Sequence, residues 1–120
     1  MRRGEVWWGD ASLAGPQRKR RPFLVVSDDA FNENASYPKV LAVHLTSAHR
    51  PSGPYAWEVD IPRGAARLPR ASVAKCAEIY TLFKDQLVTR VGSLPRALLE
   101  RVDRALTVAL GLPIISVEND

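Results

Sequence analysis

The sequence has 120 residues, of which 46% are hydrophobic and 25% are charged. This length and composition predict one globular domain and leave little room for a second. The single cysteine, Cys76, cannot form an internal disulfide, and no apolar run approaches the roughly 18 residues that cross a membrane. The first residues lead directly into strand-like sequence without a signal-peptide core. We therefore expect a cytoplasmic protein with no membrane partner.

The positive charge is concentrated near the N-terminus. The chain carries 17 basic and 13 acidic residues, a net charge of +4, and residues 1–27 hold six of the basic and two of the acidic ones. The rest of the chain is neutral overall, so the excess lies near the start, mostly in the Arg-Lys-Arg-Arg run at residues 18–21. Such a cluster attracts phosphates and polyanions. A solvated loop that keeps the protein in solution has the same composition.

The first quarter of the chain contains two short apolar runs that predict β-strands. Residues 5–8 form the first, and a polar loop with glycine and proline follows over residues 10–21. Residues 23–27 form a continuous apolar run of strand length, opened by Pro22, and we expect a buried central strand there. Residues 28–38 indicate an irregular connection or a short helical turn.

Three further segments of the chain show strand patterns. Residues 39–46 are the second strong strand, and residues 48–54 are expected to form an exposed turn. Residues 56–61 alternate apolar and acidic side chains, which indicates a half-exposed strand. Residues 71–80 predict one or two more strands.

A helix with clear ends follows these strands. Pro95 suits a first helical turn capped by Ser93 or Leu94, and Gly111 followed by Pro113 ends the helix. The apolar residues between these ends fall on one stripe at helical spacing, which predicts a buried face: Leu98, Leu99, Val102, Ala105, Leu106, Ala109 and Leu110. Many short strands with one terminal helix indicate a mainly β fold with α, a small antiparallel or SH3-like barrel.

Most familiar catalytic patterns are absent from the sequence. It contains no phosphate-binding glycine loop, no dinucleotide-binding glycine pattern, no HExxH motif and no cysteine pair for zinc. The acidic residues are scattered apart from Asp28 and Asp29, whereas metal-dependent phosphoryl transfer usually needs clustered carboxylates. If the chain is an enzyme, we therefore expect it to work without a metal or another cofactor.

RNA cleavage is a reaction that needs no metal. The 2′-hydroxyl attacks the adjacent phosphorus if a base takes its proton and a cation stabilises the charge on the phosphoryl oxygens. Arginine suits the second role because its planar fork binds two phosphate oxygens, and a threonine or serine hydroxyl can hold a phosphate oxygen in place. Arg21 and Thr46 each lie at the end of a predicted strand, where functional groups are commonly displayed. On the residues alone, Arg21 is one of four loop cations and Thr46 an ordinary strand residue.

A succession of sequence elements resembles the MazF/PemK toxin family across residues 2 to about 112. The elements are RRGEVWWGD, RRPFLVVSDDAFN, LAVHLTS, LPRASVAK and TLFKDQL, followed by VGSLPRALLERVDRALTVALGL. The resemblance implies a single toxin domain over residues 1–112 with a tail at 113–120, built as a small antiparallel barrel with a C-terminal helix. It also implies a homodimer and metal-independent, sequence-specific cleavage of single-stranded RNA to 2′,3′-cyclic phosphate and 5′-hydroxyl ends, which inhibits growth. The implied partner is a MazE-like antitoxin that blocks the RNA groove and whose complex with the toxin binds operator DNA.

The resemblance also implies roles for individual residues. Arg21, which precedes the proline, and Thr46, which closes the second long strand, correspond to the catalytic pair of the family, and Ser47 matches the polar position that follows. The RNA-binding residues are expected in the first loop and near residue 78: Gln17, Arg18, Lys19, Arg20, Glu78 and Tyr80. The family often has an amide where this chain has Glu78 and a cation where it has Tyr80. The recognised RNA sequence is therefore expected to differ, and Tyr80 can stack on a base in place of a phosphate contact.

His44 and the three tryptophans each allow two interpretations. His44 lies two residues before Thr46, so both side chains should face the same side of the strand. His44 is either an acid or base of the reaction or, the favoured reading, a packed or hydrogen-bonded histidine, because relatives often have proline at this position. We expect Trp7, Trp8 and Trp57 in the core or in a dimer interface rather than as RNA platforms.

Two other functions fit the same residues. A gyrase poison on the same barrel would act through its C-terminal residues on a protein target, and the Arg-Pro and Leu-Thr-Ser elements favour the nuclease over it. A non-catalytic nucleic-acid-binding barrel would use the basic loop and the aromatic residues. It would bind RNA with salt-dependent affinity and leave it intact.

Overall fold

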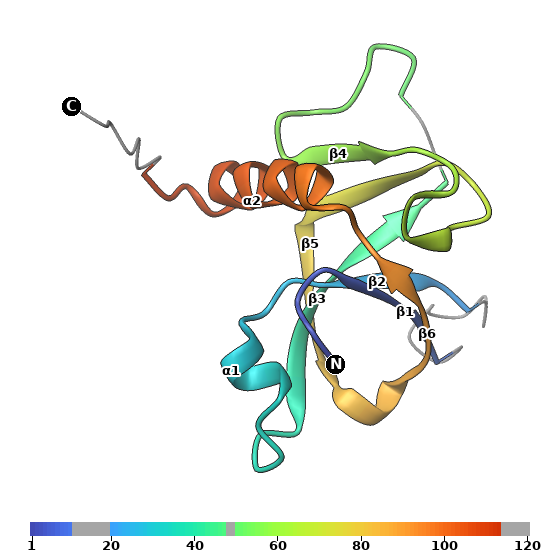
Figure 1. Cartoon of the computed structure of the whole chain (residues 1–120). Coiled ribbons are helices and arrows are strands. Elements are labelled where there is room, and N and C mark those ends of the chain that lie inside the picture. The colour runs from blue at the N-terminus through green and yellow to red at the C-terminus, as the bar shows by residue number, and fades with distance from the viewer. Residues whose placement is uncertain (11–19, 48–49, 114–120) are drawn as a thin grey trace.

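One curved antiparallel sheet carries the fold (Figure 1). The computed structural model describes residues 1–10, 20–47 and 50–113, and within these ranges six strands pair in the order β4-β5-β3-β2-β1-β6. Every neighbouring pair is antiparallel. The strands are β1 (Glu5–Gly9), β2 (Pro22–Val25), β3 (Lys39–Thr46), β4 (Glu58–Ile61), β5 (Ser72–Phe83) and β6 (Leu87–Ser93). This sheet confirms the predicted mainly β class.

Two α-helices pack against the sheet. The short helix α1 (Asp29–Asn32) begins at Asp28, whose side chain accepts a hydrogen bond from the backbone N–H of Ala30 at 2.8 Å. The C-terminal helix α2 (Arg96–Leu110) ends at Gly111, which adopts a left-handed conformation with φ of 67°. In Figure 1, α2 lies alongside β4 and β5, and α1 lies beside β3. None of the described helices is long and apolar enough to cross a membrane.

The two edges of the sheet are held together by the segment between β4 and β5. Its 3-10 helix η2 (Ala65–Arg67) contacts β6. A side chain at Gly92 would overlap the backbone oxygen of Ala66, so only glycine allows this close approach. The helix η2 is thereby held against β6, the far edge of the curved sheet.

The apolar residues form two clusters on opposite sides of the sheet. The larger one lies between the sheet and α2 and includes Leu24, Leu45, Cys76, Val102 and Leu106. The smaller one contains Phe23, Val25, Val40, Ala42, Leu82 and Leu87, with Trp7 packed against it. The predicted helix stripe is confirmed through Leu106. Leu110, however, is 56% exposed, because the last turn of α2 projects beyond the sheet (Figure 1).

The structure corrects the predicted elements in three places: one strand was missed, and two elements begin at other residues than predicted. The strand β6 was not predicted, because its pairing with β1 shifts register twice and its side chains follow no simple alternation. The strand β4 begins at Glu58 and not at residue 56, since the backbone N–H of Glu58 closes a turn onto the carbonyl of Tyr55 at 2.9 Å. The helix α2 begins at Arg96, and its N-cap is Pro95 in place of the predicted Ser93 or Leu94.

Candidate active-site pocket

A pocket of about 520 Å³ opens at one end of the sheet. It lies where β2 and β5 begin and where β3 ends. Its lining residues are Trp8, Arg20, Arg21, Pro22, Leu45, Thr46, Ser47, Leu68, Pro69, Arg70 and Ser72. The pocket therefore brings together Arg21, Thr46 and Ser47, which the sequence predicts to belong to one site.

Strand direction explains why these residues meet. The strands β2 and β3 are antiparallel neighbours, with Phe23 opposite His44, so the start of β2 and the end of β3 lie at the same end of the sheet. Arg21 immediately precedes β2, and Thr46 is the last residue of β3. The carbonyl of Arg21 accepts a hydrogen bond from the backbone N–H of Gly9 at 2.7 Å, which ties this residue to β1.

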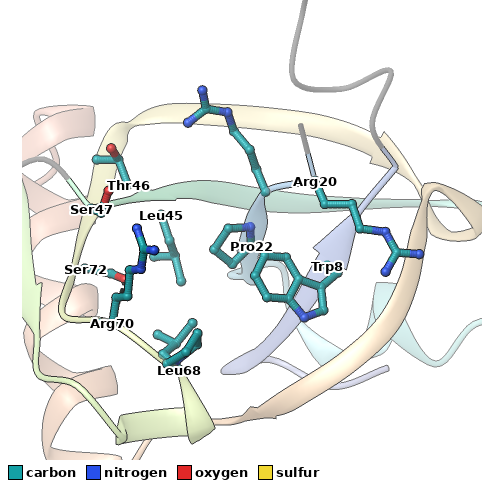
Figure 2. Close-up of a pocket in the computed structure, with 11 residues that line it drawn as sticks. Trp8, Arg20, Pro22, Leu45, Thr46, Ser47, Leu68, Arg70 and Ser72 are labelled. Atoms are coloured by element: carbon teal, nitrogen blue, oxygen red, sulfur yellow. Dashed lines mark hydrogen bonds between the residues drawn. The ribbon is translucent and has the colours of Figure 1, made fainter. Parts of the chain in front are cut away.

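The pocket is positively charged. Among the residues that the structure describes, three that line the pocket are arginines and none carries a carboxylate. Figure 2 shows the Arg70 side chain pointing toward Thr46 and Ser47, whereas the Arg20 side chain points away, past Trp8. A pocket that combines guanidinium groups with hydroxyl groups is suited to binding a phosphate through charge-assisted hydrogen bonds.

His44 lies beside Arg21 but does not line the pocket. Its Nε2 atom is 3.4 Å from Nη1 of Arg21. Because a guanidinium can only donate hydrogen bonds, Nε2 must accept, and the ring proton must then sit on Nδ1. Burial, and then the charge of Arg21, hold the pKa of His44 below its ordinary value of 6.5, against the opposing effect of Glu78. His44 is therefore neutral at pH 7 and fits the reading of a hydrogen-bonded histidine.

Glu78 and Tyr80 lie around His44 rather than in the pocket. The pairing of β3 with β5 jumps from Val43 opposite Ile79 to His44 opposite Lys75, so residues 76–78 bulge out of β5. The bulge brings Oε1 of Glu78 to 3.7 Å from Nδ1 of His44. The Tyr80 ring is 38% exposed and meets Phe23 edge-on at 5.6 Å between ring centroids.

The other residues predicted for the site or the core divide into three groups. Gln17, Arg18 and Lys19 lie outside the described residues. Trp7 and Trp8 face opposite sides of β1, so that Trp7 packs on the smaller core and Trp8 lines the pocket. Trp57 is 39% exposed and belongs to neither core, because it lies in the turn before β4.

Arg70 and Ser72 line the pocket but were not predicted as site residues. One sequence signal was available for Arg70: like Arg21, it is an arginine next to a proline and close to the start of a strand. For metal binding, the described part of the chain contains no group of three His, Cys, Asp or Glu residues that could hold an ion.

Comparison with known proteins adds independent information. Residues 2–110 match the family described as PemK-like, MazF-like toxin of type II toxin-antitoxin system. The chain is 37% identical over 112 residues to endoribonuclease MazF6 of Mycobacterium tuberculosis strain H37Rv. The aligned region covers 92% of this chain and 96% of that protein. It is 31% identical to a probable endoribonuclease MazF of Mycolicibacterium smegmatis, with 93% and 98% covered.

The fold also resembles solved structures. One is a mycobacterial endoribonuclease in complex with its cognate antitoxin, with a TM-score of 0.79, 29% identity, and 96% of this chain and 99% of that chain covered. Another is a MazE-MazF structure from Deinococcus radiodurans, with a TM-score of 0.72, 24% identity, and 94% and 97% covered. At that lower identity the second likeness concerns the fold alone.

Proposed function

The chain belongs to the PemK-like, MazF-like toxin family of type II toxin-antitoxin systems, and we propose that it is an endoribonuclease whose reaction takes place in the pocket of Arg21 and Thr46. The observation that supports this site is the meeting of Arg21, Thr46 and Ser47 in a pocket where no residue of the described lining carries a carboxylate. Such a lining favours a phosphodiester over a neutral or cationic substrate.

The proposed reaction uses the RNA's own 2′-hydroxyl as nucleophile. The 2′ oxygen bonds to the phosphorus while the bond from phosphorus to the 5′ oxygen breaks; a base takes the 2′ proton and the 5′ oxygen gains one. Arg21 stabilises the charge on the phosphoryl oxygens, and Thr46 positions the phosphate with its hydroxyl. The products are a 2′,3′-cyclic phosphate and a 5′-hydroxyl end.

Partners and location complete the proposal. As in the mycobacterial endoribonuclease whose structure includes its cognate antitoxin, we expect a cognate antitoxin to hold the toxin in check in the cytoplasm. We further expect a homodimer, and operator DNA binding by the complex with the antitoxin. The toxin domain would cover residues 1–112, with residues 113–120 as a tail.

The activity can be tested directly on RNA. We expect the purified chain, incubated in EDTA with a long and weakly structured RNA, to produce fragments cut at one short sequence. Sequencing of the ends should show 2′,3′-cyclic phosphates and 5′-hydroxyls. RNA that is bound but left intact would indicate the non-catalytic barrel, and intact RNA together with trapped gyrase–DNA complexes would indicate the gyrase poison.

The hydrogen bond between His44 and Arg21 predicts a pH dependence. Protonation of His44 removes the acceptor at Nε2 and places a second positive charge beside Arg21. The pKa of His44 lies below 6.5, so cleavage should be unaffected at pH 7 and fall as the pH drops through that lowered pKa.

We expect His44→Gln, which keeps an acceptor that does not titrate, to cleave RNA at pH 7 within a few-fold of the wild type and to lose the acid limb of the pH–rate profile. Single-turnover rates from pH 5 to 8 measure this. An unchanged acid limb in the variant would remove His44 from the explanation. A His44→Ala protein that cleaves RNA at the wild-type rate from pH 5 to 8 would also remove His44 from the explanation.

A further inference from the structure

We propose that Arg70 forms a second phosphate subsite in the pocket, which holds the RNA phosphate next to the one that is cleaved. This inference rests on the proposed function, because it assigns a further part of the same substrate to the same pocket. Arg70 would bind and position RNA without acting on the reacting atoms.

The backbone around Arg70 is held in place. The hydroxyl of the buried residue Ser72 donates a hydrogen bond to the Arg70 carbonyl at 3.2 Å. On the N-terminal side, η2 is anchored where Ala66 packs on Gly92. The Arg70 side chain is thus presented from a fixed segment, and it points into the pocket toward Thr46 and Ser47 (Figure 2).

The order of strands places Arg70 and Arg21 on opposite sides of Thr46. In the sheet, β3 lies between β5 and β2, and Thr46 at the end of β3 pairs with Val73 near the start of β5. Arg70 precedes β5 and Arg21 precedes β2. An RNA strand that crosses the pocket past Thr46 therefore meets Arg21 on one side and Arg70 on the other.

The charge of the pocket also favours binding of more than one phosphate. Each phosphodiester carries one negative charge, whereas Arg21 and Arg70 both line the pocket as permanent cations and none of its described lining residues carries a carboxylate. If Arg21 is engaged with the scissile phosphate, the exposed Arg70 guanidinium is still available to bind a second anion. A flanking phosphate of the same strand supplies this charge and lets Arg70 make the paired hydrogen bonds that guanidinium and phosphate form.

Salt dependence of binding tests this subsite without relying on cleavage. The probe is a mixed-sequence RNA with 2′-O-methyl groups throughout, which keeps every phosphate but has no free 2′-hydroxyl to attack. For single strands, log K falls with log salt by about 0.7 per neutralised phosphate. We expect Arg70→Gln to make this slope shallower by about 0.7 and to weaken binding about tenfold or more at low salt.

The matched control is Arg63→Gln, which removes the same charge from an exposed residue of the same β4–β5 segment that does not line the pocket. This variant should keep the wild-type slope. Equal slopes for Arg70→Gln and Arg63→Gln would overturn the proposal. A chain that does not cleave unmodified RNA would overturn the proposed function, while the comparison of slopes would still decide the subsite.

The position of the phosphate is tested with neutral linkages. In RNAs that span the mapped cut, one phosphate at a time is replaced by an uncharged methylphosphonate. The affinity lost on Arg70→Gln should vanish when one flanking linkage is neutral and persist for the more distant linkages. If it vanishes when the scissile linkage is neutral, Arg70 acts on that phosphate and the flanking subsite is wrong.

Discussion

Replacing Arg21 with alanine should lower the rate of RNA cleavage by about 10²- to 10³-fold, the usual cost of removing one donor to a developing oxyanion. The expected loss follows from the position of Arg21, which lines the same pocket as Thr46, where the described part of the lining carries no carboxylate. The fold should be retained, because the Arg21 side chain lies outside both apolar cores. Its contact with His44 is long for a hydrogen bond, at 3.4 Å, so its loss should cost little stability. Single-turnover cleavage and Tm measure the two effects separately.

Two further variants separate a guanidinium at this position from positive charge in general. Arg20→Ala removes the neighbouring charge, whose side chain points away from Thr46 (Figure 2). We expect this variant to bind RNA more weakly, but to cleave RNA that is already bound within a few-fold of the wild-type single-turnover rate. Arg21→Lys keeps the charge but loses the planar fork, and its rate should stay well below the wild-type rate. An Arg21→Ala protein that still stops cell growth would contradict the assigned role.

Much of the strand framework could be predicted because it depends on local patterns. Residues 39–46 form β3 as predicted, and the apolar run after Pro22 forms the central strand β2. The bulge at residues 76–78 of β5 could not be predicted from local patterns, because it is a shift in the pairing of β5 with β3. The acidic residue Glu58 lies in a segment whose alternation indicated a half-exposed strand, yet only 2% of its side chain is exposed. Its partners are brought to it by other parts of the chain.

The candidate site was predictable to the extent that it lies at strand ends. Arg21 and Thr46 stand at the boundaries of two strong apolar runs, and the resemblance to a family singled them out. The contact of His44 with Arg21 and the approach of Arg70 depend on packing between segments far apart in the chain. The prediction that His44 and Thr46 face the same side considers β3 alone. In the structure, the His44 ring also contacts Arg21, Phe23 and Glu78, which belong to other segments of the chain.

Glu58→Gln should destabilise the fold by about 3 kcal/mol, which for a domain of this size lowers Tm by about 10 °C. Its carboxylate accepts hydrogen bonds from Arg50 at 3.0 and 3.1 Å, from Lys75 at 3.1 Å and from the backbone N–H of Tyr55 at 3.2 Å. The variant leaves Lys75 without its counter-charge and loosens the turn before β4. Arg50 is partly exposed, so solvent screening reduces its share of the loss.

The same contacts predict acid sensitivity. The hydrogen bonds from Arg50, followed by those from Tyr55 and Lys75, lower the pKa of Glu58 from 4.5 to about 2, against the opposing effect of burial. A carboxyl group with a lowered pKa in the folded state binds fewer protons than in the unfolded chain. Its contribution to stability is therefore complete above pH 4.5 and is lost as the pH falls toward 2.

Denaturant unfolding at pH 7 and at several values below pH 4.5 tests both statements. The wild type should lose free energy of unfolding across this acid range, and Glu58→Gln should lose less, because the titrating group is gone. Asp60→Asn is the matched control, since Asp60 is an exposed carboxylate two residues further along β4. It should keep both the wild-type Tm and the wild-type acid dependence. Equal Tm values for the two variants would mean that the buried carboxylate and its cations do not stabilise the turn that leads into β4.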